Sequence, residues 1–265
     1  MKPGEGVGYR NHLIAMGLVA GILSVALAYL FSRIDFVPQQ ASAERHAIDA
    51  FIRLLFSIAS VFFAVVTTVL VYVLIFFRAR PGDTGDGPPI RGKTALEVTW
   101  TIVPLVIVAG LAVHGGLVLD EITAPGPPQS ELIVDVTAAR FSWQFAYPEF
   151  GISSYELQLP VDRRVLFNIE STDVVHSFWV PEFGPKQDAV PGMTTQLRIT
   201  PTKVGQYTVV CSQLCGDAHT YMTAPVQVKS SGDFQDWVKQ QQQQQGPPPP
   251  TPQGTPEPQQ VQHEP

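Results

Sequence analysis

Two cysteines, one histidine and one methionine lie in a single short segment of the chain, and all four side chains can bind a metal ion. Residues 211–222 have the spacing Cys-x3-Cys-x3-His-x2-Met, which places Cys211, Cys215, His219 and Met222 in one loop. A second histidine, His176, lies upstream. Soft sulfur ligands together with imidazole select copper, and one cysteine with two histidines and a weakly bound methionine forms a blue-copper electron-transfer site. The segment therefore predicts a copper centre with one thiolate more than a blue-copper site needs.

The additional thiolate indicates a pair of copper ions, because both sulfur atoms can bridge two metals while one histidine binds to each metal. The six predicted ligands are His176, Cys211, Gln213 through its backbone carbonyl, Cys215, His219 and Met222. A paired centre spreads one electron over two metals, so few atoms have to move on reduction. Neither copper needs an open coordination position. We therefore expect electron transfer, and not bond-making chemistry, at this site.

The same residues allow other interpretations. Two cysteines outside the cytoplasm could form a disulfide, although a disulfide leaves His219 and Met222 without a role. A structural zinc site is a second option, but methionine is a poor zinc ligand. Taken singly, His176 could be an ordinary strand histidine and Met222 could fill a core. Their occurrence together with both cysteines favours the copper site.

The elements that precede this segment have the composition of membrane helices. The chain has 265 residues, of which 45% are hydrophobic and only 15% are charged, against about 25% charged residues in soluble domains. Three apolar runs, at residues 13–31, 54–77 and 98–119, are each long enough to cross a bilayer, which takes about 20 apolar residues. The last two runs predict a transmembrane helix hairpin over residues 50–122.

Basic residues predict the orientation of these spans. The loop between the second and third runs carries Arg78, Arg80, Arg91 and Lys93, and loops rich in Lys and Arg stay in the cytoplasm. The third run then ends outside, so that everything after Asp120 is extracytoplasmic. We expect a multi-pass protein of a bacterial plasma membrane whose copper domain lies on the extracytoplasmic side.

Residues 1–43 have two interpretations. A basic start, an apolar run and the sequence Ala41-Ser42-Ala43 match the pattern of a secretory signal peptide with its cleavage site. The apolar run is longer than the roughly 7–15 residues of a signal core, however, and the Ala-x-Ala lies far downstream of it. The segment could equally be an additional permanent transmembrane helix.

After residue 130 the pattern changes to short strands separated by proline and glycine. Strands are predicted at residues 131–138, 141–147, 155–159, 164–170, 194–200, 206–210 and 224–229. Several short strands between turns indicate a sandwich or a barrel, which we place at residues 130–239. Residues 240–265 are rich in Gln and Pro and lack the apolar side chains for a core, so we expect a disordered tail.

At these residues the chain resembles subunit II of cytochrome c oxidase. Residues 211–222 are similar to the loop that holds the binuclear copper centre, CuA, of that family, and the match is highly specific. Residues 173–193 are similar to the family's first-histidine segment, and residues 97–104 resemble the start of its second transmembrane helix. The resemblance runs from about residue 51 to residue 237.

The resemblance implies a membrane protein with a transmembrane helix hairpin followed by an all-β cupredoxin Greek-key barrel, which holds two copper ions through the six residues named above. It also implies the electron-accepting subunit of a respiratory enzyme. Electrons would come from cytochrome c, a separate protein, because no Cys-x-x-Cys-His haem-attachment motif occurs in this chain. They would pass to haem in subunit I, where oxygen is reduced with proton pumping. Subunit III is a further expected partner.

Two positions depart from the family pattern. A glutamate that helps to hold magnesium usually lies between the two cysteines, but this chain has Gln213, whose neutral side chain is a weaker ligand for a hard cation. The carbonyl role of Gln213 survives, whereas bound magnesium is in doubt. The aromatic patch that receives electrons usually opens with tryptophan, and Phe141 takes that position here, followed by Trp143. These two residues could supply the donor contact or could be core aromatics of a strand.

Charged residues bear on proton uptake, on attraction of the electron donor and on nucleic-acid binding. Glu97 lies near the cytoplasmic start of the last span, where the resemblance implies a proton-uptake carboxylate for subunit I; a glutamate favoured by the helix dipole is the alternative. Residues 120–240 hold 14 acidic and 8 basic side chains, and an acidic surface would attract a basic cytochrome c. The net charge of −6 gives no support for nucleic-acid binding.

Other copper and oxidase proteins fit the pattern less well. A membrane-anchored copper chaperone of thioredoxin fold also has Cys-x3-Cys and a distant histidine, but that histidine lies far downstream, whereas His176 precedes the cysteines here. The quinol-oxidase form of subunit II has the same barrel without copper, which Cys211 and Cys215 argue against. The nitrous-oxide-reducing enzyme needs a large propeller that 265 residues cannot hold.

Overall fold

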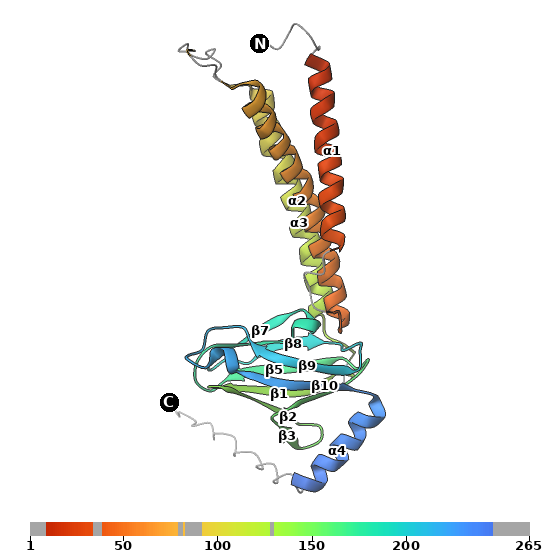
Figure 1. The fold of residues 1–265 in the computed structure, drawn as a ribbon. Coiled ribbons are helices and arrows are strands. Elements are labelled where there is room, and N and C mark those ends of the chain that lie inside the picture. Colours follow the sequence, from red (N-terminus) through yellow and green to blue (C-terminus); the bar gives the residue numbers. More distant parts are fainter. Residues whose placement is uncertain (1–8, 34–38, 79–81, 83–91, 128–129, 246–265) are drawn as a thin grey trace, which may run out of the picture. The chain divides into compact units, whose positions relative to one another are not determined.

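The computed structural model describes residues 9–33, 39–78, 82, 92–127 and 130–245. The described chain forms two units. The first contains α1 (Tyr9–Arg33), α2 (Ala43–Phe76) and α3 (Thr94–Thr123), together with the short 3-10 helix η1 (Pro181–Phe183). The second contains the strands and helix α4 (Ser231–Gln245) (Figure 1). Most of the predicted tail, residues 246–265, lies outside the described residues.

All three helices of the first unit are long and apolar enough to cross a membrane. Both helices of the predicted hairpin extend beyond their apolar runs, since helical structure continues through the flanking polar turns at residues 43–53 and 120–123. Within the described structure no residue of α3 is buried. A helix that is apolar all round and uncovered by its own chain is typical of a membrane span.

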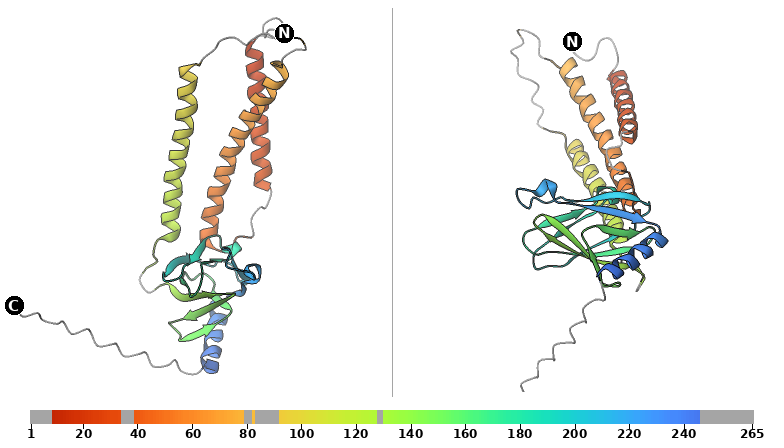
Figure 2. Two further views of the ribbon diagram at one scale, coloured as in Figure 1. Left: turned by 90° about the vertical axis from the view of Figure 1, so that its left-hand side faces the viewer. Right: turned by 60° about the horizontal axis from the view of Figure 1, so that its bottom comes forward.

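The start of α2 lies in the Ala-x-Ala sequence that was a candidate cleavage site. The Ser42 hydroxyl caps the helix, because it accepts a hydrogen bond from the Arg45 N–H at 3.0 Å and donates one to the Phe183 carbonyl at 2.7 Å. The Ala41 N–H donates to the Glu182 carbonyl at 3.0 Å. Both Ala41 and Ser42 are buried. This sequence is therefore a built part of the first unit, and α1 packs alongside the helix that it starts (Figure 2).

The strands of the second unit form two five-stranded sheets, in the orders β3-β2-β1-β5-β8 and β4-β10-β9-β6-β7. Their bounds are β1 (Leu132–Ala139), β2 (Ser142–Tyr147), β3 (Ile152–Ser154), β4 (Leu157–Pro160), β5 (Val165–Ser171), β6 (His176–Trp179), β7 (Lys186–Ala189), β8 (Thr195–Ile199), β9 (Gly205–Cys211) and β10 (Thr223–Lys229). Most neighbours are antiparallel, but β1 pairs with β5 and β4 pairs with β10 in parallel. The chain crosses from one sheet to the other several times, for example from β3 to β4 and from β4 to β5. The unit is therefore a cupredoxin-like sandwich, which confirms the predicted fold class.

Alternate side chains of the strands fill the space between the sheets. In β1 every second residue is buried, as expected for a strand with one face toward a core. Aromatic rings form the centre of this core: Phe178 of β6 contacts Trp143, Phe145 and Phe167 at centroid distances of 5.8, 6.5 and 5.2 Å. The core therefore anchors β6, one of the two strands that carry predicted metal ligands.

Helix α4 corrects the prediction of a disordered tail for residues 240–245. Its first half buries Phe234 and Val238, and its second half is held by glutamine side chains. The Gln245 carboxamide accepts from the Ser153 N–H at 3.0 Å and donates to the Ser153 carbonyl at 2.6 Å, and the Gln242 side chain donates to the Phe150 carbonyl at 3.0 Å. A glutamine run can thus be ordered when its amides pair with the free edge of strand β3.

Candidate metal centre

Neighbouring strands and one loop bring the predicted metal ligands together. His176 opens β6, Cys211 closes β9, and these strands pair through Phe178 and Cys211. The loop between β9 and β10 contains Cys215 and the short helix η2 (His219–Tyr221). The Cys211 N–H donates to the Met222 carbonyl at 3.1 Å. This hydrogen bond closes the loop, so that residues distant in sequence face one another.

The two cysteine sulfur atoms are the centre of the cluster. The Sγ atoms of Cys211 and Cys215 lie 3.8 Å apart, and both residues are free thiols. His176 Nδ1 lies 3.8 Å from Cys211 Sγ, and His219 Nδ1 lies 3.5 Å from Cys215 Sγ. Met222 Sδ lies 3.8 Å from Cys215 Sγ.

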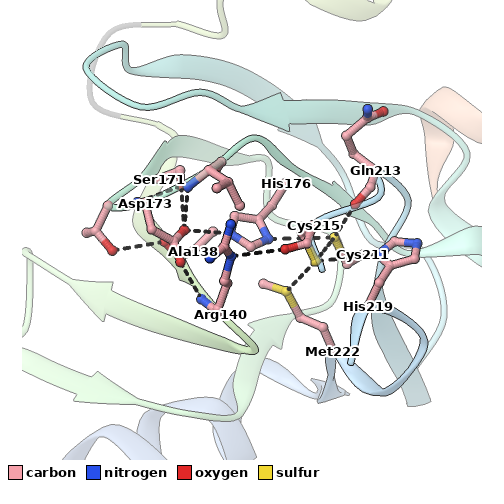
Figure 3. Close-up of polar contacts among 12 residues, drawn as sticks. Ala138, Arg140, Ser171, Asp173, His176, Cys211, Gln213, Cys215, His219 and Met222 are labelled. Atoms are coloured by element: carbon pink, nitrogen blue, oxygen red, sulfur yellow. Dashed lines mark hydrogen bonds and ion pairs between the residues drawn. The ribbon is translucent and has the colours of Figure 1, made fainter. Parts of the chain in front are cut away.

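The sixth predicted ligand is also in place. The Gln213 carbonyl oxygen lies 3.2 Å from Cys211 Sγ, while its side chain is exposed and directed away from the sulfur atoms (Figure 3). Each cysteine therefore has one imidazole nitrogen and one weaker donor, a carbonyl or a thioether, beside it. The other four predicted ligands therefore surround the pair of cysteine sulfur atoms.

This donor set fits a soft metal ion. Metal–sulfur bonds of about 2.3 Å allow one metal ion to contact both sulfur atoms across the 3.8 Å that separates them. His176, Cys211 and Cys215 alone place their ligand atoms within 4.8 Å of one another. Soft sulfur with imidazole is the donor chemistry that favours copper over hard cations.

Burial makes the Cys215 thiol costly to ionise without a cation. Burial, with the neighbouring Cys211 thiol as a further cause, raises the pKa of Cys215 to about 11. A bound metal ion acts in the opposite direction and lowers the pKa of the thiol, because it stabilises the thiolate. Binding of a cation at Cys215 is therefore coupled to release of the thiol proton.

Asp173 orients His176. Its Oδ1 atom lies 2.8 Å from His176 Nε2, which leaves Nδ1 facing the sulfur pair. Partial burial acts against ionisation, but hydrogen bonds from His176, the Val174 N–H and the Arg140 N–H hold the pKa of Asp173 well below its usual range. A carboxylate on the far nitrogen of a ligating histidine fixes its tautomer and ring orientation. Sequence reasoning missed Asp173; its position three residues before His176 was the available signal.

Phe141 and Trp143 occupy different environments. The Phe141 ring is 36% exposed and covers Gly216, since a Cβ atom at Gly216 would lie 3.1 Å from Phe141 Cζ. Trp143 is 1% exposed and packs edge-on against His176 at a centroid distance of 6.2 Å. Of these two residues, Phe141 alone is exposed at the surface, where its ring lies over Gly216, the residue after Cys215.

Glu97 and Arg140 do not belong to the set of predicted metal ligands. Glu97 is exposed in the first turn of α3, a position that suits both a proton-uptake carboxylate and a glutamate favoured by the helix dipole. Arg140, which the sequence did not single out, donates from Nε to the Cys215 carbonyl at 3.1 Å. Arg140 thus ties the cysteine loop to Asp173, which its own N–H contacts.

Comparison with known proteins identifies two family matches. Residues 31–115 match the family model of the transmembrane domain of cytochrome c oxidase subunit II, and residues 153–230 match that of its periplasmic domain. Nearly all of α1 precedes the first match.

Similar proteins carry the same description. Cytochrome c oxidase subunit 2 of Synechocystis sp. is 32% identical over 83% of this chain and 80% of its own, and that of Thermostichus vulcanus is 33% identical over 84% of each. The crystal structure of the periplasmic domain of subunit II of cytochrome oxidase from Bradyrhizobium japonicum is 27% identical, with a TM-score of 0.42, and the match covers 44% of this chain and 97% of that one. The chain belongs to the cytochrome c oxidase subunit II family.

Proposed function

We propose that this chain is the electron-accepting subunit of a respiratory haem–copper oxidase. It takes electrons from a cytochrome c at a binuclear copper centre and passes them to haem in subunit I, where oxygen is reduced with proton pumping. The observation that supports this proposal is that four donor groups surround two free thiols. His176 Nδ1 and the Gln213 carbonyl oxygen lie 3.8 and 3.2 Å from Cys211 Sγ. His219 Nδ1 and Met222 Sδ lie 3.5 and 3.8 Å from Cys215 Sγ.

The copper pair, when bound, supplies a one-electron carrier whose charge is shared by two metals. Cys211 and Cys215 would hold the copper through their sulfur atoms, and His176 and His219 would bind it through Nδ1. Asp173 keeps the His176 ring in place, and the buried core behind it excludes water. Gln213 contributes its carbonyl alone, and its neutral side chain does not support a magnesium site.

Phe141 is the proposed point where electrons arrive. Its exposed ring lies over Gly216, next to Cys215, so that a docked haem edge would be separated from the cysteine loop by one aromatic ring. We expect Phe141→Ala to slow donor oxidation at least tenfold, on the order of one lost aromatic hot-spot contact, with the copper spectrum unchanged. The control is Tyr155→Ala, which removes another exposed aromatic, 69% exposed, outside the cysteine loop. Equal slowing by both variants would remove Phe141 from the route.

The location and partners follow from the same proposal. The basic loop between α2 and α3 lies in the cytoplasm, and the copper domain lies on the extracytoplasmic side of a bacterial plasma membrane, docked on subunit I with subunit III nearby. Glu97 would lie on the cytoplasmic side, where subunit I takes up protons. The acidic copper domain would attract its donor, so donor oxidation should slow steeply as salt rises; rates that do not change with salt would contradict steering.

We further propose that α1 is retained as a third span. Cleavage after Ala43 would remove Ser42, which caps α2 and bonds to Phe183, and Ala41, whose N–H bonds to Glu182. Loss of a helix cap costs about 1 kcal/mol. The apolar run of α1 also ends well before the Ala-x-Ala sequence, unlike a signal core. The intact mass of the purified protein tests this proposal directly.

The test of the main proposal is copper stoichiometry with electron paramagnetic resonance on the purified full chain. We expect two coppers per chain and the hyperfine pattern of one unpaired electron shared equally by two copper nuclei. One copper per chain with a single-nucleus pattern would reduce the site to an ordinary blue-copper centre. A Cys211–Cys215 disulfide in the active complex would contradict the proposal outright.

The rival functions predict different results. A copper chaperone of thioredoxin fold would carry its cysteines at the start of a helix, but here Cys211 ends strand β9 in a two-sheet sandwich. A chaperone would also give up its copper to an acceptor protein, whereas an electron-transfer centre retains it. A quinol-oxidase subunit would bind no copper at all.

A further inference from the structure

The loop of the β6–β7 hairpin belongs to the membrane unit. Strands β6 and β7 are antiparallel, with Trp179 opposite Lys186 at the end of the hairpin. The chain leaves the β domain after residue 180 and returns to it at Lys186, and residues 181–185 between them are part of the unit that contains α1, α2 and α3. Strand β6 begins with His176, so one hairpin carries a proposed copper ligand and a loop that belongs to the membrane unit.

The start of α2 holds this loop by three hydrogen bonds. Three consecutive backbone carbonyls, at residues 181–183, each accept one bond. The donors are Arg45 Nη1 at 2.6 Å for residue 181, the Ala41 N–H at 3.0 Å for residue 182 and the Ser42 hydroxyl at 2.7 Å for residue 183. The whole 3-10 helix η1 is therefore held by one short segment of the chain, and Arg45 is its only charged donor.

An ion pair orients the Arg45 side chain. Asp49, one turn further along α2, lies with Oδ1 2.8 Å from Arg45 Nε, and both side chains are nearly fully buried. The Gln40 side chain donates to the other oxygen of Asp49 at 2.6 Å. A buried ion pair adds little net stability, because the cost of desolvation offsets the attraction between the charges. A role in fixing one arrangement of the loop therefore explains this pair better than a role in stability.

Gly184 lets the loop approach Arg45 closely. A Cβ atom at Gly184 would lie 2.9 Å from Arg45 Cδ and 3.2 Å from Arg45 Cα. The backbone of Gly184 also has a φ of +96°, which favours glycine. Arg45 thus contacts the loop twice, through a hydrogen bond at Pro181 and through packing at Gly184.

We propose that Arg45 is a positioning residue for electron transfer from the copper centre to subunit I. It fixes the loop of the hairpin that begins with His176, and so limits the motion of this ligand strand. Arg45 acts through the loop and is not a metal ligand. A misplacement of about 1 Å can slow a reaction between bound groups by on the order of 100-fold. The inference rests on the proposed function, because it concerns the path of the same electron.

The experiment compares two rates in the full chain purified with subunit I. One is the reduction of copper by cytochrome c, and the other is the transfer from copper to haem after rapid injection of one electron. We expect Arg45→Gln to slow the second rate by roughly tenfold or more and to leave the first rate and the copper spectrum unchanged. Arg53→Gln, an exposed position of the same helix, is the control for loss of one charge and should change neither rate.

A variant with the charge retained tests the geometry of the contact. A lysine ammonium does not reproduce the fork of a guanidinium, which here binds Asp49 and the Pro181 carbonyl through different nitrogen atoms. We expect Arg45→Lys to slow the transfer to haem less than Arg45→Gln does. Hydrogen exchange of the loop amides in residues 182–184 should be faster in both variants than in the unmodified complex.

Gly184→Ala tests the same contact from the loop without any change of charge. Its methyl group would displace Arg45, so we expect the slower transfer to haem seen in Arg45→Gln. Gly192→Ala is the matched control, because Gly192 also has a positive φ, of +74°, but nothing within 4 Å of an added Cβ atom. It imposes similar backbone strain in open space and should leave the transfer rate unchanged. If Arg45→Gln does not assemble with subunit I, Arg45→Lys and Gly184→Ala supply the test.

Three outcomes would overturn the inference. Normal transfer to haem in both Arg45→Gln and Gly184→Ala would show that the loop contact does not position the copper centre. Equal slowing in Arg53→Gln or Gly192→Ala would make the effect one of charge or of backbone strain. Loss of copper in step with the slower transfer would give Arg45 a structural role only. Paired copper in the unmodified complex would leave the proposed function intact in each case, whereas its absence there would contradict the proposed function itself.

Discussion

The metal-ligand cluster and the contact between helix α4 and Tyr147 lie in the same domain but differ in the partners of their buried polar groups. Beneath α4, the Tyr147 hydroxyl accepts from the Gln158 N–H at 2.8 Å and donates to the Gln158 carbonyl at 2.9 Å, under the rings of Phe234 and Trp237. The Tyr147 hydroxyl and both backbone groups of Gln158 therefore have partners at normal hydrogen-bond distance. In the cluster, the two cysteine sulfur atoms lie 3.8 Å apart with imidazoles at 3.5 and 3.8 Å.

The difference shows how a structural contact can be told from a binding site. Burial raises the pKa of both Tyr147 and Cys215 above their ordinary values, so the direction of the shift does not distinguish them. The partners do: Tyr147 is satisfied by the backbone, whereas the donors of the cluster face one another and would all be satisfied by a cation. The Tyr147 contact therefore stabilises the fold, whereas the arrangement of the cluster favours metal binding.

Among the substitutions that test this comparison, loss of one cysteine sulfur atom should have the largest effect. We expect Cys215→Ser to abolish the paired copper signal, because a hydroxyl does not replace a bridging thiolate, and to leave at most one copper per chain. Copper analysis and electron paramagnetic resonance measure this. Ser212→Ala, at a loop residue with no predicted ligand role, is the matched control. A paired signal in Cys215→Ser would show that the two sulfur atoms are not the bridge.

Loss of the carboxylate behind His176 should have the next largest effect. Asp173→Ala removes the acceptor of the His176 Nε2 hydrogen bond, and such changes weaken metal affinity by about 10- to 100-fold. Copper should still form a pair, with an altered hyperfine splitting and reduction potential. Competition with a copper chelator measures the affinity, and Asp188→Ala, an exposed carboxylate of β7, is the control. An unchanged potential would mean that Asp173 has a structural role only.

Tyr147→Phe tests the satisfied contact. It removes a buried hydroxyl and leaves the Gln158 N–H and carbonyl without partners, so we expect a loss of about 1–3 kcal/mol in the free energy of unfolding with the copper spectrum unchanged. Thermal unfolding followed by tryptophan fluorescence measures this. Loss of the paired copper signal in this variant would show that the two regions are coupled.

The pH dependence provides a second test of Tyr147. The folded protein holds its phenol proton more tightly than the unfolded chain, whose pKa is the ordinary 10.0. The contribution is therefore fully present below pH 10 and is lost as the pH rises above it, since the unfolded state then binds fewer protons. We expect unmodified protein to lose stability above pH 10 with a steeper slope than Tyr147→Phe. Parallel slopes would contradict the assignment.

The smallest expected effect concerns the end of α4. Gln245→Ala removes the carboxamide that bonds to both backbone groups of Ser153, and we expect a loss of about 1 kcal/mol. Gln243→Ala, an exposed residue of the same run, should change stability less. Exposure of the β3 edge should also promote self-association, which analytical ultracentrifugation measures. Identical behaviour of the two variants would show that the carboxamide is not needed.

Much of the site was predictable because its residues are chemically specific and close in sequence. The spacing of Cys211, Cys215, His219 and Met222 defines a soft-ligand loop without any structure, and the apolar runs define membrane helices by length alone. The strands with alternating apolar residues were found within a few residues. Strands β3, β6 and β7 were not predicted, because they are short and their burial depends on neighbours distant in sequence.

The sequence by itself determined the ligand types, the membrane spans and a β domain, because these depend on composition and short-range spacing. Only the tertiary structure decided that His176 meets Cys211 across paired strands, that Asp173 lies behind His176, and that Phe141 rather than Trp143 reaches the surface. It also decided that the glutamines at the end of α4 are ordered. For His176, Phe141 and the glutamines, the physical reason is a hydrogen bond or packing contact between segments far apart in the chain, which local pattern does not encode. Asp173 is only three residues before His176, but sequence spacing alone does not say that its carboxylate faces the ring.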